Sequence, residues 1–164
     1  MSRSLTRREL GFHFEDQVHS LLTTTNQYVL REKEIVQKYG KLANGVDHLI
    51  CINDQNKTII AIQDKWRASS QQLHDINHFI SCVRHIERTE QKYVIGIYVT
   101  KKPITSGAIQ SLNEENKICN RYHHISNSNM NHVMHKLMCV LYYLGIYMYD
   151  PDGSTIMLDE TFYS

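Results

Sequence analysis

The chain has 164 residues, of which 41% are hydrophobic and 21% charged, and its formal net charge at pH 7 is +1. This length and composition predict one soluble globular domain with its own core, residues 1–164. No window approaches the roughly 18 consecutive apolar residues that a membrane-spanning helix needs, and the N-terminus MSRSLTRREL lacks the apolar region of a secretory signal. We therefore expect an intracellular protein, cytoplasmic or nuclear, with no membrane partner.

The four cysteines are widely spaced, at positions 51, 82, 119 and 139, and form no CxxC pair. This spacing predicts reduced thiols in place of a disulfide framework. Cys119, His123, His124, His132 and His135 match no standard zinc-site spacing. The net charge does not decide for or against a polyanionic partner, because local clustering of Lys and Arg matters more than the total.

The first half of the chain alternates helical and strand-like segments. A helix is predicted from Thr6 to about Leu22, because TRRE can form a capping box and apolar residues follow at helical spacing. QYVLREKEIV, residues 27–36, has strand character. Residues 41–66 then read as two strands joined by the polar turn NDQNK, which predicts a hairpin.

An amphipathic helix is predicted from Ser70 to about Ile86, followed by the strand KYVIGIYVT, which is apolar on both faces. KPITSGAIQSLN supports a short helix and KICNRYHHI a short strand or loop. The chain closes with a helix at residues 130–144 and two strand-like halves around the turn DPDG. This order predicts an α/β fold, a mixed central β-sheet flanked by helices on both faces.

The stretch IIAIQDKW ends an apolar run with Gln63, Asp64 and Lys65. Side chains two apart in a strand point the same way, so Gln63 and Lys65 share one face and Asp64 points to the other. The predicted partner strand contains Asp47. Because neighbouring strands lie about 4.8 Å apart, Asp47 can converge with Gln63 and Lys65 if the register permits.

An acid, an amide oxygen and an ammonium together suit metal-assisted phosphodiester hydrolysis. Mg²⁺ prefers oxygen ligands at about 2.1 Å and keeps several waters, so one carboxylate and one amide or backbone carbonyl suffice to hold it against a phosphate. A nearby lysine can orient the attacking water or offset developing negative charge. The pattern therefore predicts a hydrolytic site at this edge of the sheet.

GVDHLI followed by IIAIQDKW resembles the core of the PD-(D/E)XK nucleases, in the variant where Gln replaces the acidic residue, as in Mrr-type restriction endonucleases. GFHFEDQVHSLL is similar to the first helix of that family, whose glutamate belongs to the active site, and Glu15 takes that place. The resemblance covers roughly Arg8 to Leu112. It implies a restriction-endonuclease-like three-layer fold with a core at about residues 6–115.

The resemblance also implies a divalent-metal-dependent DNA endonuclease that uses Mg²⁺, for which Mn²⁺ can substitute. It makes Asp47 the principal metal ligand, Gln63 the second ligand and Lys65 the neighbour of the attacking water, while Glu15 supports metal or water. Holliday-junction resolvases share this fold and a similar glutamate, but they usually carry an acid where this chain has Gln63. The expected partner is DNA, either duplex or branched.

Four residues near the predicted strand ends are candidates for DNA contact: Trp66, Arg67, Lys101 and Lys102. Arg7 and Arg8 can extend this patch. A solvated face is the competing interpretation of the cations, and packing that of the tryptophan. Cutting two strands needs two active sites, so we also expect a homodimer, with residues of about 127–160 as its interface.

Other interpretations remain open. Asp47 can belong to a turn and Glu15 to a solvated helix face, while Asp64 is expected to be exposed or to pair locally with Lys65 or Arg67. A catalytically inactive nucleic-acid-binding module on the same fold is the rival function. An accidental motif in a structural protein is the third possibility, and it predicts that Asp47 and Glu15 lie far apart.

Overall fold

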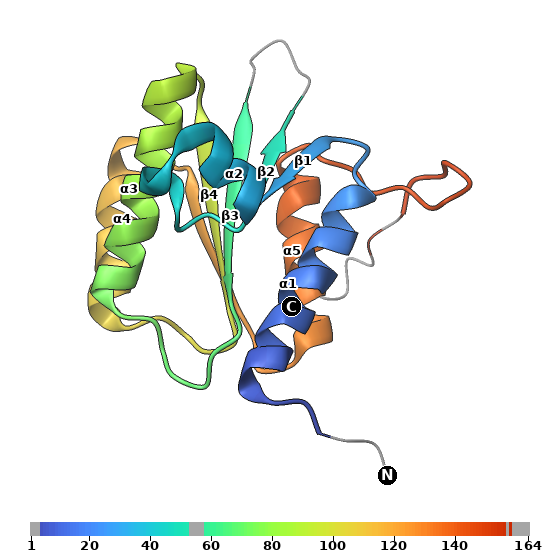
Figure 1. Ribbon diagram of the computed structural model, residues 1–164, viewed down its shortest axis with the longest axis horizontal. Helices are drawn as coiled ribbons and strands as arrows, with labels where there is room; N and C mark the ends of the chain where they lie inside the picture. The colour runs from blue at the N-terminus through green and yellow to red at the C-terminus, as the bar shows by residue number, and fades with distance from the viewer. Residues whose placement is uncertain (1–3, 53–57, 157, 159–164) are drawn as a thin grey trace.

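Five strands form one mixed sheet with helices on both faces (Figure 1), in a computed structural model that describes residues 4–52, 58–156 and 158. This confirms the predicted α/β architecture. The elements, in chain order, are α1 (Arg7–Thr23), β1 (Tyr28–Arg31), α2 (Glu32–Tyr39), the 3-10 helix η1 (Lys41–Ala43), β2 (His48–Cys51), β3 (Ile59–Lys65), α3 (Leu73–Glu90), β4 (Val94–Thr100), α4 (Ser106–Ile118), β5 (Tyr122–Ser126) and α5 (Met130–Tyr143).

The strands lie in the order β1-β2-β3-β4-β5, antiparallel from β1 to β3 and parallel from β3 to β5. The predicted pairing of β2 with β3 is confirmed, and the turn NDQNK that was expected to join them lies outside the described residues. β2 begins at His48, opposite Ile62, whereas β3 continues to Lys65 beside β4. The polar end of β3 therefore extends past its antiparallel neighbour.

Each face of the sheet carries its own apolar cluster. Ile59 and Ala61 of β3 belong to the cluster that is covered by α2, α3 and α4, and Ile60 and Ile62 belong to the cluster that is covered by α1 and α5. This strict alternation explains why β3 reads as a continuous apolar run, because a strand that is covered on both faces buries every side chain. α5 thus contributes its apolar stripe to the chain's own core.

The capping box at the start of α1 is present as predicted. The Thr6 hydroxyl accepts the Glu9 N–H at 3.2 Å, and the Glu9 carboxylate accepts the Thr6 N–H at 2.7 Å. Among the described helices, none combines the length and apolar character that crossing a membrane requires. All four cysteines are free thiols.

Two expected strands have a different structure. Only residues 28–31 of the segment at 27–36 form a strand, because Glu34 accepts the Arg31 N–H at 2.9 Å and starts α2, which buries Ile35 and Tyr39 one helical turn apart. Within the described residues, the expected C-terminal hairpin is represented by one bridge, between Tyr149 and Thr155. Its turn is confirmed, since the Gly153 N–H donates to the Asp150 carbonyl at 2.8 Å.

Candidate active site

The polar end of β3 is bound to Asp47, the residue that directly precedes β2. The Asp47 N–H donates to the Ile62 carbonyl at 2.9 Å, and its Oδ2 accepts the Asp64 N–H at 2.8 Å. Continuing the β2–β3 register by one residue sets Asp47 opposite Gln63. Asp47 and Gln63 are 7% and 5% exposed, and Lys65 is half-buried at the end of the strand. The predicted convergence of Asp47 with the end of β3 is thus present.

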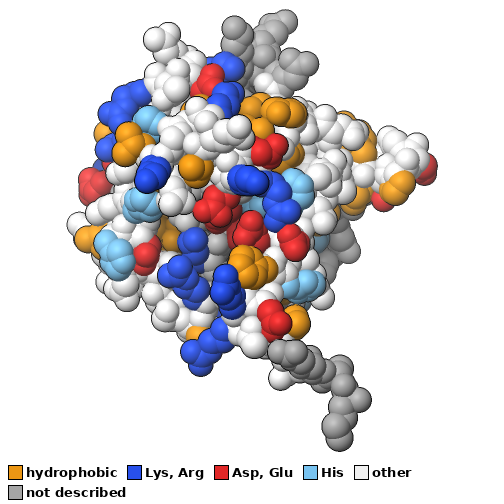
Figure 2. Space-filling model, in the orientation of Figure 1, with side chains coloured by type: hydrophobic (Ala, Val, Ile, Leu, Met, Phe, Trp, Pro, Cys, Tyr) orange, Lys and Arg blue, Asp and Glu red, His pale blue; other side chains and the backbone are white. Residues whose placement is uncertain are grey.

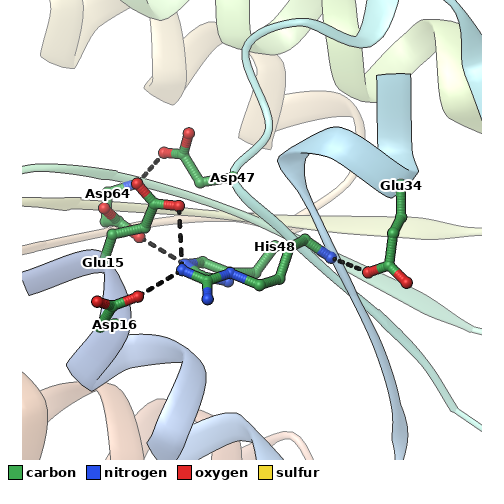
Figure 3. Close-up of polar contacts among 7 residues, drawn as sticks. Glu15, Asp16, Glu34, Asp47, His48 and Asp64 are labelled. Atoms are coloured by element: carbon green, nitrogen blue, oxygen red, sulfur yellow. Dashed lines mark hydrogen bonds and ion pairs between the residues drawn. The ribbon is translucent and has the colours of Figure 1, made fainter. Parts of the chain in front are cut away.

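Glu15 reaches this end of the sheet from α1. Its side chain is 23% exposed, and its Oε1 lies 3.4 Å from Nη2 of Arg31, which also binds the Asp16 carboxylate at 2.7 Å. Figure 3 shows Glu15 and Asp47 together beside Asp64. Glu15 is close enough to Asp64 to raise the pKa of that carboxyl. The structure therefore gathers Glu15 and Asp47 around one residue of β3.

The expectation for Asp64 is wrong. Asp64 is only 7% exposed, and its Oδ2 lies 2.8 Å from Nε2 of the fully buried His48, not beside Lys65 or Arg67. The pleat of the sheet explains this pairing, because His48 pairs with Ile62, two residues before Asp64, and so points to the same face. Sequence reasoning missed His48, although a polar residue next to Asp47 at the start of a buried strand was the available signal.

Burial shifts the pKa values of Asp47, Asp64 and His48. Desolvation raises the pKa of Asp47 to about 7, and the neighbouring Asp64 carboxylate adds to the rise. Desolvation also raises the pKa of Asp64 to about 7, with a further contribution from Glu15. The pKa of His48 falls to about 4 for the same reason, so His48 is neutral at pH 7. Two buried carboxyls that ionise only near neutrality form a site where a cation is favoured.

The residues at this site fit a hard divalent cation. Asp47 and Glu15 supply carboxylate oxygens, and Gln63 supplies an amide oxygen. Within the described residues, no group of three or more His, Cys, Asp or Glu side chains could hold a metal ion. A cation here would therefore depend on the Gln63 amide and on retained waters, which is a coordination that Mg²⁺ accepts.

Basic residues border the site. Figure 2 shows Asp and Glu side chains near the middle of one face, with Lys and Arg side chains around them. Arg67 follows β3 and Lys101 follows β4, and the Lys101 N–H donates to the Lys65 carbonyl at 3.3 Å. Because β3 and β4 are parallel, the residues after them emerge at the same edge. Lys102, the next residue, is exposed.

Trp66 is packed, not free. Its ring centroid lies 4.6 Å from that of Phe14 in α1, and the Lys101 ammonium lies 5.7 Å from its ring centroid. Trp66 is half-buried and belongs to the apolar cluster beneath α1 and α5. The packing interpretation of this residue thus has direct structural support, while its cation–π partner is one of the predicted DNA-contacting lysines.

No protein-family model matches the chain, and no curated protein matches it. Among solved structures, the chain is similar to a repair endonuclease from Pyrococcus abyssi, with a TM-score of 0.48 and 19% identity over 76% of this chain and 47% of that one. It is also similar to EndoMS in a complex with dsDNA, with a TM-score of 0.48 and 21% identity over 77% of this chain. The chain spans about half the length of these two proteins, 47% of each.

Proposed function

We propose that this protein is a divalent-metal-dependent DNA endonuclease that hydrolyses phosphodiester bonds. The observation that supports the proposal best is the bond between Asp47 Oδ2 and the Asp64 N–H, which fixes a buried acid at the end of the strand that carries Gln63 and Lys65. The Gln63 variant of the motif favours an Mrr-like enzyme. A Holliday-junction-resolvase-like activity on branched DNA is the second version of the same proposal.

Each residue has a role in this proposal. Asp47 and Gln63 hold Mg²⁺ or Mn²⁺, and Glu15, whose position Arg31 restrains, supports the metal or its water. When bound, the ion polarises the scissile phosphate and lowers the pKa of a coordinated water. The Lys65 ammonium orients the attacking water and offsets the negative charge that develops on the phosphate. Trp66, Arg67, Lys101 and Lys102 lie where the rest of the DNA strand would run.

The test is cleavage of supercoiled, linear and four-way-junction DNA in Mg²⁺ or Mn²⁺. We expect wild type to cut at least one substrate, and Asp47→Asn and Lys65→Met to lose activity by about 100-fold or more, the usual effect of removing a charge-stabilising group. Asp152→Asn, at an exposed turn, is the control for protein preparation and folding, and it should keep full activity. A wild-type protein that leaves all three DNA substrates uncut would contradict the enzyme proposal.

A catalytically inactive nucleic-acid-binding module is the alternative function, and Gln63 in place of an acid is the observation that favours it. Titration calorimetry separates the two, because a module would bind DNA but show no divalent-metal site that depends on Asp47.

The variant Gln63→Glu gives a second way to distinguish an enzyme from a non-catalytic module. An additional carboxylate beside Asp47 strengthens any true Mg²⁺ site and destabilises the metal-free protein by like-charge repulsion. For an enzyme we therefore expect a larger Mg²⁺-dependent rise in melting temperature for Gln63→Glu than for wild type, because ligand-linked stabilisation grows with affinity. A module would show the loss of metal-free stability without any gain from Mg²⁺.

A further inference from the structure

A pocket with a volume of about 640 Å³ lies beside the candidate active site. The first turn of α1 forms one wall, and the segments that follow β3 and β4 form the others. Three of its lining residues are cations and none is acidic; the lining consists of Arg7, Leu10, Trp66, Arg67, Ala68, Ser69 and Lys101. Three separate elements thus direct positive charge into one cavity.

The cations of this pocket have no carboxylate partner among the described residues. Some other cations of the chain bind carboxylates, as Arg31 binds Asp16 and Arg84 binds Glu115. Within the part of the chain that the structure describes, Arg7, Arg67 and Lys101 form no ion pair. An anionic ligand would therefore meet three cations that need not break an existing salt bridge to bind it.

Arg7 stands at an electrostatically unfavourable position. It is the first residue of α1, where the helix macrodipole favours acids and disfavours cations. Trp66 contacts two groups of the protein, the Phe14 ring and the Lys101 ammonium. We read Trp66 as the wall that positions Lys101, which leaves the cations as the groups that face a ligand.

The pocket is also close to the residue that would meet the scissile phosphate. Arg67 follows Lys65 by two residues, and extended chain rises about 3.3 Å per residue. Successive phosphates of one DNA strand rise about 3.4 Å along the helix axis. A strand whose scissile phosphate lies at Lys65 would thus bring a neighbouring phosphate to the pocket.

We propose that Arg7, Arg67 and Lys101 form a seat for a single phosphate group of the DNA strand, beside the site of cleavage. Because all three cations line one cavity, we assign them to the same phosphate. The identity of the strand as DNA rests on the proposed function, whereas the specificity for a phosphate rests on the pocket itself. The seated phosphate is either an internal one or the terminal phosphate of a DNA end.

The first test uses inorganic phosphate and the fluorescence of Trp66, the only tryptophan of the chain. At constant ionic strength set with chloride, wild type should show a saturable fluorescence change that Arg67→Ala/Lys101→Ala abolishes. Arg88→Ala is the matched control, because Arg88 is exposed near the far end of α3 and forms no ion pair in the described part of the chain. No saturable change in wild type would overturn the proposal, even if the protein cuts DNA.

The second test counts phosphates by the salt dependence of DNA binding, measured in EDTA so that no cleavage occurs. Each neutralised phosphate of duplex DNA contributes about 0.9 to the slope of log K against log salt. One shared phosphate predicts that Arg7→Ala/Arg67→Ala/Lys101→Ala lowers this slope by about 0.9. A fall of about 2.7, three times that amount, would show three separate backbone contacts and overturn the single seat.

Competition separates the two sources of the phosphate. A short 5′-phosphorylated oligonucleotide that reverses the Trp66 signal, when its 5′-hydroxyl counterpart does not, assigns the seat to a terminal phosphate. Equal competition by both oligonucleotides assigns it to an internal phosphate. A protein that binds inorganic phosphate in this pocket but no DNA would retain the phosphate seat and contradict the proposed nuclease.

Discussion

At the scale of single residues, Asp47 occupies a position where its charged form is disfavoured. Its carboxylate accepts one backbone hydrogen bond, but burial and the adjacent Asp64 carboxylate raise its pKa to about 7. The metal ligand proposed for Asp47 is a charge-dependent role that would account for this cost.

Asp47→Asn tests this cost. The amide keeps an oxygen for the Asp64 N–H while it removes the buried charge. A folded-state pKa raised above the unfolded value lowers stability as pH rises between the two values, here from about pH 4 to 7. We therefore expect Asp47→Asn to match wild type near pH 4 and to exceed it by about 1–4 kcal/mol at pH 8, in EDTA.

Urea denaturation at several pH values measures the difference in the free energy of unfolding between Asp47→Asn and wild type. His48 contributes in the opposite direction, because its lowered pKa makes stability rise over part of the same range. Asp47 itself acts to raise the pKa of His48, so the difference between the variant and wild type includes this interaction. A variant that is less stable than wild type at pH 8 would show that the Asp47 carboxylate stabilises the fold.

The contact between Asp64 and His48 is the part of the site that the sequence could not reveal. Alternation along β3 correctly separated Asp64 from Gln63 and Lys65, because the period of a strand is a local property. The burial of Asp64 and its bond to His48 depend on the register of β2 against β3 and on the helix above them. These are properties of the tertiary structure, so the pair was missed.

At the scale of elements, local signals predicted the helices best. The capping box and apolar spacing of α1 lie within one short segment and are present in the structure. The sequence predicts a strand where α2 lies, because the apolar residues of α2 are few and the segment starts with Tyr28, Val29 and Leu30, which are typical of a strand. The C-terminal strands needed a pairing partner that a turn signal alone does not supply.

The N-terminus of α1 offers a prediction in which stability and binding change in opposite directions. Removing a cation from the first turn of a helix relieves its repulsion with the macrodipole, which is worth about 0.3–1 kcal/mol. We expect Arg7→Ala to raise the melting temperature slightly and to weaken DNA binding, because Arg7 lines the phosphate seat. Thermal denaturation and fluorescence anisotropy measure the two effects.

Arg8→Ala is the matched control. Arg8 lies in the same helical turn but does not line the pocket, and it contacts the Phe12 ring at 5.4 Å. Because Arg8 can extend the basic patch, Arg8→Ala should lower DNA affinity less than Arg7→Ala does, and the loss of its contact with Phe12 offsets part of the gain in helix stability. If both variants lost affinity equally, the N-terminus of α1 would act as a diffuse basic surface.

At the scale of the whole molecule, the helix α5 has a buried side and an exposed side. Its apolar stripe, which includes Val133, Leu137 and Leu141, is buried in the chain's own core. Three tyrosines at the end of α5 and just beyond it stay exposed: Tyr142 at 41%, Tyr143 at 83% and Tyr147 at 44%. Exposed aromatic residues are enriched at protein interfaces, so this surface is our candidate for the homodimer contact.

A two-fold dimer would give one DNA-bound particle two active sites, and both strands could be cut before dissociation. We expect light scattering to show a dimer at micromolar concentration and Tyr143→Lys to shift it toward monomer, because an interface pocket rejects an unpaired charge. Tyr28→Lys is the matched control, since Tyr28 is 67% exposed on the edge strand β1.

Dimerisation would also determine whether a plasmid is nicked or linearised. If wild type converts supercoiled plasmid directly to linear DNA, Tyr143→Lys should accumulate the nicked form, because each monomer then cuts one strand per encounter. A wild-type protein that elutes as a monomer at micromolar concentration would contradict the dimer. If it still linearised the plasmid without a nicked intermediate, one active site would have to cut both strands in succession.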